Sequence, residues 1–179
     1  NKSNHDISKL FKSYLNKGLH GICFSPYEEG QDLNDVLSEK QISRRMKIIE
    51  PYTKWVRSFS CTKGNEYIPK IAKQYGLKTV VGAWISNDEA KNKAEINNLV
   101  KLANEGMVDI AVVGNEVLLR NELSEAEVLA FIQTVKEKLP SHIPVTYIDS
   151  YYIFDQYPAL IKACDLLLIN CYPFWEGAD

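Results

Sequence analysis

The chain has 179 residues, of which 45% are hydrophobic and 25% charged, so it is long enough for one globular domain with a sizeable core. Its formal net charge of −2 provides no basic surface, so nucleic acids and anionic membranes are not expected partners. No apolar run approaches the ~18–20 residues that span a bilayer, and the four cysteines and three histidines have no metal-site spacing, so we expect free, buried thiols and no metal or cofactor.

The first 17 residues predict a helix that precedes the first strand and covers one end of the fold. Its apolar stripe has helical spacing and consists of Ile7, Leu10, Phe11, Tyr14 and Leu15. The same segment lacks a continuous hydrophobic run, so it is not a signal peptide. A mature secreted protein would already have lost such a peptide.

Six short apolar runs then follow, and each is typical of a strand buried on both faces of a parallel sheet. They occupy residues 21–25, 55–59, 78–84, 108–114, 144–148 and 165–172. The segments between them have the apolar periodicity of amphipathic helices. Three of these helices have predicted capping boxes, formed by Ser38 with Gln41, Ser86 with Glu89, and Ser124 with Glu127.

Alternating strands and helices fit either an open doubly wound sheet or a barrel. The first predicted strand is followed by "SPYEEGQ", which puts Pro26 and two carboxylates where an open nucleotide-binding sheet would hold phosphate. The α/β fold predicted is therefore a TIM (β/α)8-type barrel, of which this chain has six of the eight strand–helix units. Residues 1–179 would form a single, incomplete barrel catalytic domain, and its two open edges would favour self-association.

In such a barrel, the reacting groups stand at the carboxyl ends of the strands. These positions offer one arginine, an amide, a carboxylate and several aromatic rings, with no Ser/His or Cys/His pair. The candidates are Tyr27, Arg57, Trp84, Asn115, Glu116, Tyr151, Tyr172 and Trp175. Aromatic rings suit the apolar faces of sugars, and amides and carboxylates suit their hydroxyls, so a carbohydrate site is indicated.

Glu116 is the sharpest of these candidates, because it ends the fourth strand in "VVGNEV". A carboxyl at the mouth of a barrel is partly desolvated, which favours the protonated form that a general acid needs. Asn115 beside it would hold a substrate hydroxyl or orient the acid. The alternative is an ordinary loop or capping carboxylate.

Other candidates also have structural alternatives. Arg57 stands inside the apolar strand "KWVRSF" and needs a carboxylate partner, either in a structural ion pair or as the group that keeps a catalytic carboxylate ionised. Trp84 and Trp175 would be sugar platforms or packing residues. Tyr172 would donate a hydrogen bond to a nucleophilic carboxylate or cap the core.

Four segments, "GICFSPY", "VRSFS", "VVGNEV" and "LLINCYPFW", resemble glycoside hydrolase family 17, the β-1,3-glucanases, in their order and spacing. The resemblance runs from about Gly18 to the end of the chain and is closer to the bacterial and fungal branch. It implies a (β/α)8 barrel that hydrolyses β-1,3-glucan with retention of configuration. It also implies that Glu116 is the acid/base, that Asn115 contacts sugar, and that Arg57 and Tyr172 belong to the site.

Two departures from the family pattern affect the expected activity. The family's nucleophile, a glutamate ending the seventh strand, has no counterpart here, and Glu176 matches a loop position instead. We therefore expect this chain alone to hydrolyse laminarin negligibly. Many relatives also have tyrosine where this chain has Phe24, which removes one hydroxyl contact to sugar.

Several functions remain open on the sequence alone. A glucan transglycosylase would use the same scaffold, with a sugar hydroxyl replacing water. A non-catalytic carbohydrate-binding fragment would keep the aromatic rings, and an unrelated barrel enzyme would act on other small molecules. The resemblance implies export to the periplasm or the cell exterior, where polymeric glucan is encountered.

Overall fold

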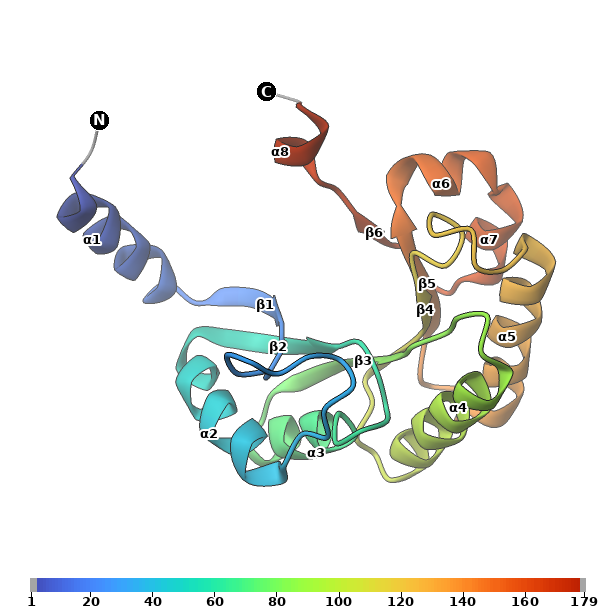
Figure 1. Ribbon diagram of the computed structural model, residues 1–179, viewed down its shortest axis with the longest axis horizontal. Helices are drawn as coiled ribbons and strands as arrows, with labels where there is room; N and C mark the ends of the chain where they lie inside the picture. Colours follow the sequence, from blue (N-terminus) through green and yellow to red (C-terminus); the bar gives the residue numbers. More distant parts are fainter. Residues whose placement is uncertain (1–2, 178–179) are drawn as a thin grey trace.

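The computed structural model describes residues 3–177, and its centre is one sheet of six parallel strands. The strands are β1 (Leu19–Cys23), β2 (Thr53–Ser58), β3 (Lys78–Ala83), β4 (Ile110–Asn115), β5 (Val145–Ser150) and β6 (Leu168–Asn170). They lie side by side in chain order, so β1 and β6 are the two edges. The curved sheet in Figure 1 is a partial (β/α) barrel, which confirms the predicted fold class. The two residues at each end of the predicted 1–179 domain lie outside the described residues.

The connecting helices lie along one side of this sheet (Figure 1). They are α2 (Glu39–Ile49), with the short 3-10 turn η1 (Glu50–Tyr52) after it, α3 (Tyr67–Gln74), α4 (Glu89–Asn104), α5 (Glu125–Lys138), α6 (Tyr151–Gln156) and α7 (Pro158–Ala163). Their apolar faces pack on the strands in two hydrophobic clusters. The last connection consists of two short helices, because Pro158 at the start of α7 has no N–H with which to continue α6.

Two of the three predicted helix starts agree with the structure. The Ser124–Glu127 capping box is complete, and the side chain of Ser38 accepts a hydrogen bond from the Gln41 N–H. The prediction for Ser86 is wrong, because the side chain of Asp88 caps α4 instead. Ser86 is buried just before the helix.

The N-terminal helix does not cover the barrel, contrary to the sequence prediction. Helix α1 (Asn4–Leu15) has the expected amphipathic pattern and a Ser3–Asp6 capping box, but none of its residues is buried. Figure 1 shows α1 projecting from β1, and α8 (Pro173–Glu176) projecting beyond β6. Periodicity predicted the helix correctly, but a helix can form without packing its apolar face. No helix within residues 3–177 is long and apolar enough to cross a membrane.

The concave face of the sheet has a small apolar core of its own. Val80, Val112 and Ile148 are buried there. Beside them lies a pocket of about 280 Å³ whose lining includes Arg57 and Asn170. The expectation of buried thiols is wrong for Cys23 and Cys171, which are both exposed. Cys23 ends β1 and Cys171 follows β6, and these two strands are the edges of the sheet. Cys61 is buried and Cys164 half-buried.

Candidate active site

The "VVGNEV" segment contains a bulge at the end of β4. Val112 pairs with Thr146 and Asn115 with Ile148, so three steps along β4 oppose two steps along β5. Gly114 in the bulge has φ +88°, and a Cβ atom there would lie 2.8 Å from Cγ2 of Val117. A residue with a side chain would therefore be both strained and too close to its neighbour. Because bulges change the direction of the side chains that follow, this one sets where Asn115 and Glu116 point.

Glu116 receives two hydrogen bonds from the sixth strand and the residues after it. Its backbone has φ +54°, and its N–H donates to the Ile148 carbonyl at 2.8 Å. The amide nitrogen of Asn170 and the hydroxyl of Tyr172 each donate to Oε1 of Glu116 at 2.7 Å. Burial and the bond to Glu116 raise the pKa of Tyr172 to about 12, so its phenol is a hydrogen-bond donor at neutral pH. The strained backbone thus displays a carboxylate whose position is fixed from β6.

Arg57 contacts the side-chain amide of Asn115, the residue before Glu116. Its Nη2 donates to Oδ1 of Asn115 at 2.5 Å, and its guanidinium carbon lies 4.4 Å from the centre of the Phe59 ring. Among residues 3–177, the other polar contact of this guanidinium is with the sulfur of Cys23 at 3.8 Å. The expected carboxylate partner is therefore wrong, and an amide oxygen and an aromatic face replace it. The hydrogen bond from Arg57 keeps the amide oxygen of Asn115 facing the guanidinium group, so the NH2 group of Asn115 points away from Arg57.

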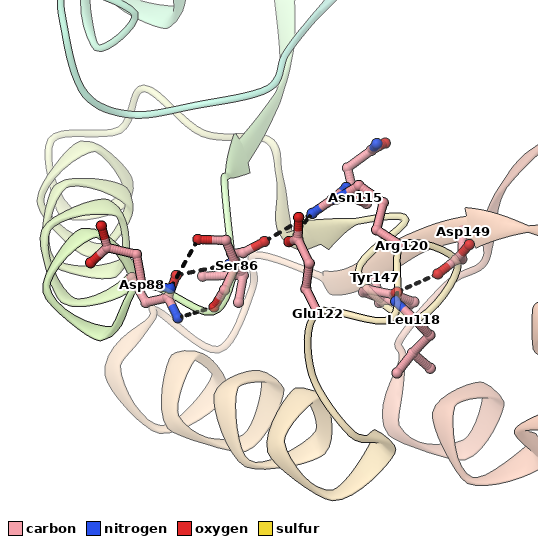
Figure 2. A network of polar contacts seen from close by, with 10 residues as sticks. Ser86, Asp88, Asn115, Leu118, Arg120, Glu122, Tyr147 and Asp149 are labelled. Carbon is pink, nitrogen blue, oxygen red and sulfur yellow. Dashed lines mark hydrogen bonds and ion pairs between the residues drawn. The ribbon is translucent and has the colours of Figure 1, made fainter. Parts of the chain in front are cut away.

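A second arginine, Arg120, joins the ends of β3 and β4, and the sequence analysis missed it. Figure 2 shows its guanidinium group between Asn115 and Glu122. It donates to the Asn115 carbonyl, to the Ile85 carbonyl at 3.2 Å and to Glu122 at 2.8 Å, and it lies 4.7 Å from the centre of the Trp84 ring. The hydrogen bond from Arg120 lowers the pKa of Glu122. Arg120 is in a turn without regular periodicity, so no pattern indicated the direction of its side chain.

Tyr147 and Asp149 form a buried pair on β5, and Figure 2 shows both. The Tyr147 hydroxyl donates to Oδ2 of Asp149 and accepts from the Leu118 N–H at 3.0 Å. Both side chains are fully buried. Burial and, to a smaller extent, the charge of Glu116 raise the pKa of Asp149. This pair connects β5 to the segment that carries Glu116. Asp149 is recognisable in the sequence as a polar residue at the end of a strand, whereas Tyr147 was not distinguished from its apolar neighbours.

An aromatic pocket of about 390 Å³ opens at the ends of β1, β2 and β3. Tyr27 and Trp84 line it together with Phe24 and Phe59, so the structure brings two of the predicted sugar-binding residues together. The other three predicted aromatic residues do not line this pocket, and Tyr172 bonds to Glu116 instead. Tyr151 starts α6 and packs against Tyr152, whereas Trp175 lies on α8 beside Phe174 with 82% of its surface exposed.

This fold and this arrangement of side chains define a barrel of the glycoside hydrolase class, with a hydrogen-bonded glutamate and an aromatic pocket at the strand ends. The model of the BtgE/BtgC glycoside hydrolase domain matches residues 21–179, and the chain belongs to that family.

Relatives and solved structures agree with this family. The chain is 30% identical over 147 residues to a glucan 1,3-beta-glucosidase of Schizosaccharomyces pombe, covering 74% of this chain and 45% of that protein. The family 17 β-1,3-glucanosyltransferase of Rhizomucor miehei has a similar structure, with a TM-score of 0.77 and 27% identity over 91% of this chain. An active-site mutant of that enzyme has been solved in complex with laminaritriose.

The chain is shorter than each of these proteins. It spans under half of the Schizosaccharomyces pombe relative and 60% of the Rhizomucor miehei chain. It also spans 28% of a probable glucan endo-1,3-beta-glucosidase of Aspergillus fumigatus, to which it is 26% identical over 198 aligned positions.

Proposed function

We propose that the protein acts on β-1,3-glucan by a retaining two-carboxylate mechanism in which Glu116 is the general acid/base. The observation that carries this proposal is the placement of Glu116 on the bulge of β4, where Asn170 and Tyr172 both donate to its Oε1 at 2.7 Å. Neither donor occupies Oε2, so that oxygen is the one that would carry the proton. A carboxyl fixed in this way is suited to deliver a proton in one direction.

In the first step, Glu116 would protonate the glycosidic oxygen while a second carboxylate attacks the anomeric carbon. In the second step, the Glu116 carboxylate would take a proton from the water that releases the sugar. Retaining enzymes place the two carboxyl groups about 5–5.5 Å apart. Asp149 is unsuited to the nucleophilic role, because it is fully buried and bonded to Tyr147 and the Ser150 N–H. The nucleophile would come from outside the described part of the chain.

The substrate class is supported by the pocket and by the relatives. Tyr27 and Trp84 present aromatic surface at the strand ends, which suits the C–H faces of glucose rings. Because Arg57 bonds to the oxygen of the Asn115 amide, the NH2 group of Asn115 would donate to a sugar hydroxyl. The relatives named above are β-1,3-glucan enzymes, and one of them was solved with laminaritriose.

Transglycosylation is the second candidate, favoured by one observation. The similar structure from Rhizomucor miehei is a glucanosyltransferase, which passes the sugar to another glucan rather than to water. The two candidates share the first step and the role of Glu116. Product analysis separates them, because hydrolysis yields glucose or short oligomers and transfer yields oligosaccharides longer than the substrate.

The test is the Glu116→Gln variant of the full-length protein, assayed on laminari-oligosaccharides. We expect kcat to fall by about 10²–10⁴, the usual contribution of a general acid/base. Glu137→Gln is the matched control, because Glu137 is exposed at the far end of α5. Activity of Glu116→Gln within about threefold of the unmodified protein would refute the assigned role.

A further inference from the structure

Helix α4 carries a row of three polar side chains on the face that packs against the barrel. Asn92, Glu95 and Asn98 are spaced three residues apart, so they share one side of the helix. Asn92 is 3% exposed and Glu95 is completely buried. Burying a carboxylate is costly unless hydrogen-bond donors surround it, so the partners of Glu95 indicate why it is there.

Glu95 accepts four hydrogen bonds from two different strand ends. After β2, it accepts from the Ser60 hydroxyl at 2.5 Å, the Cys61 N–H at 2.6 Å and the Thr62 hydroxyl at 2.6 Å. After β3, it accepts from the Trp84 N–H at 3.1 Å. One buried carboxylate therefore connects the loop after β2 to the end of β3.

The other two members of the row hold the same segments by their backbones. The amide nitrogen of Asn98 donates to the Cys61 carbonyl at 2.7 Å, so α4 binds both backbone groups of Cys61. Asn92 exchanges two hydrogen bonds with the backbone of Ser86, at 2.6 and 2.9 Å. The buried position of Ser86, which does not cap α4, follows from this pairing.

Three of the residues held by Glu95 line the 390 Å³ aromatic pocket, namely Ser60, Thr62 and Trp84. The Ser60 and Thr62 hydroxyls donate their protons to Glu95, so the lone pairs that remain are hydrogen-bond acceptors. A ligand hydroxyl that meets them has to donate, as sugar hydroxyls can. The ring of Trp84 belongs to a residue whose backbone is fixed by the same carboxylate.

We infer that Glu95 is a positioning residue for a glucan subsite formed by Ser60, Thr62 and Trp84. It sets the shape of this subsite and leaves the Ser60 and Thr62 hydroxyls as hydrogen-bond acceptors toward a ligand. This inference rests on the proposed function and adds a determinant of substrate binding to it. Glu95 would act through the loops, since its side chain is fully buried and its oxygens accept hydrogen bonds from Ser60, Cys61, Thr62 and Trp84. The Glu116 carboxylate is held by a separate set of donors from β6.

The test is Glu95→Gln in the full-length protein, with steady-state kinetics on laminari-oligosaccharides of increasing length. Glutamine keeps one acceptor oxygen and turns an NH2 group toward donors, so we expect the KM to rise about tenfold, as for the loss of a charged hydrogen bond. The kcat should stay within about twofold, because the Glu116 network is unchanged. Glu89→Gln is the matched control, since Glu89 is exposed in the first turn of the same helix.

Asn98→Ala is a second variant that keeps the buried carboxylate and removes only the bond to the Cys61 carbonyl. We expect a KM increase of about threefold, and this variant decides the matter if Glu95→Gln does not fold. Suppose that the unmodified protein cleaves or transfers glucan. The inference is then overturned if the folded variants have an unchanged KM, or if only their kcat falls. If the unmodified protein has no activity on these oligosaccharides, the proposed function fails first.

Discussion

Replacing Tyr147 with phenylalanine removes one buried hydroxyl that holds two groups. The hydroxyl accepts from the Leu118 N–H at 3.0 Å and donates to Asp149. Both Tyr147 and Asp149 are fully buried, so water does not reach the abandoned partners. Leaving a buried polar group unsatisfied costs about 1–3 kcal/mol. With two such groups, we expect the free energy of unfolding to fall by about 2–6 kcal/mol at pH 7.

The loss should depend on pH in a defined direction. Burial raises the pKa of Asp149 in the folded protein, so its ionisation lowers stability as the pH rises through that pKa. The Tyr147 hydroxyl opposes this shift by bonding to the carboxylate. Without it, the folded pKa of Asp149 rises further. The destabilisation should therefore be larger at pH 7 than near pH 3, which is below the ordinary pKa of an aspartate and below the raised pKa of folded Asp149.

The assay is urea denaturation followed by circular dichroism, on the full-length protein at both pH values. Tyr157→Phe is the matched control, because no hydrogen bond joins the Tyr157 hydroxyl to another residue within 3–177 and its ring is half-buried. A loss below about 0.5 kcal/mol for Tyr147→Phe, or an equal loss at the two pH values, would refute the role given to this pair.

Three further predictions concern the bulge of β4 and its carboxylate. Gly114→Ala should cost at least about 2 kcal/mol in denaturation experiments, because its Cβ would meet Val117. The control Gly76→Ala also has a positive φ, of +71°, but open space around the added Cβ, and it should cost less. Glu116→Gly should be more stable than Glu116→Ala by about 1 kcal/mol, since φ is +54° there, and equal stability would contradict the strain. Tyr172→Phe should lower kcat/KM about tenfold by removing one donor to Glu116, which steady-state kinetics would check.

Much of the fold followed from local patterns. Each strand of the sheet overlaps an apolar run identified in the sequence, and the helices between them have the predicted periodicity. Burial on both faces selects continuous apolar runs, and the structure has such burial in β3, β4 and β5. The same expectation is wrong for the edge strands β1 and β6, which contain no buried residue because each has a neighbouring strand on one side only. The position of Glu116 at the end of β4 followed in the same way. The apolar stripe of α1 predicted a helix correctly. The prediction that this helix covers one end of the fold is wrong, because none of its residues is buried.

The partners of the site residues were decided by the tertiary structure. Arg57 meets Asn115 across 58 residues, and Tyr172 meets Glu116 across 56. The bulge that directs Glu116 depends on pairing with β5, which no local pattern in β4 specifies. The sequence does show a carboxylate, Glu95, on the apolar face of α4 beside Ile96 and Leu99. Its four hydrogen-bond donors, however, come from the ends of β2 and β3.

The sequence by itself determined which segments are strands, which are helices and which strand ends carry a carboxylate, an amide or an aromatic ring. These properties depend on burial and backbone preference over a few neighbouring residues. The tertiary structure decided how the side chains of Arg57, Glu95, Glu116 and Tyr147 are held. Hydrogen bonds between strand ends form only after the sheet has brought distant segments together, so no local pattern encodes them.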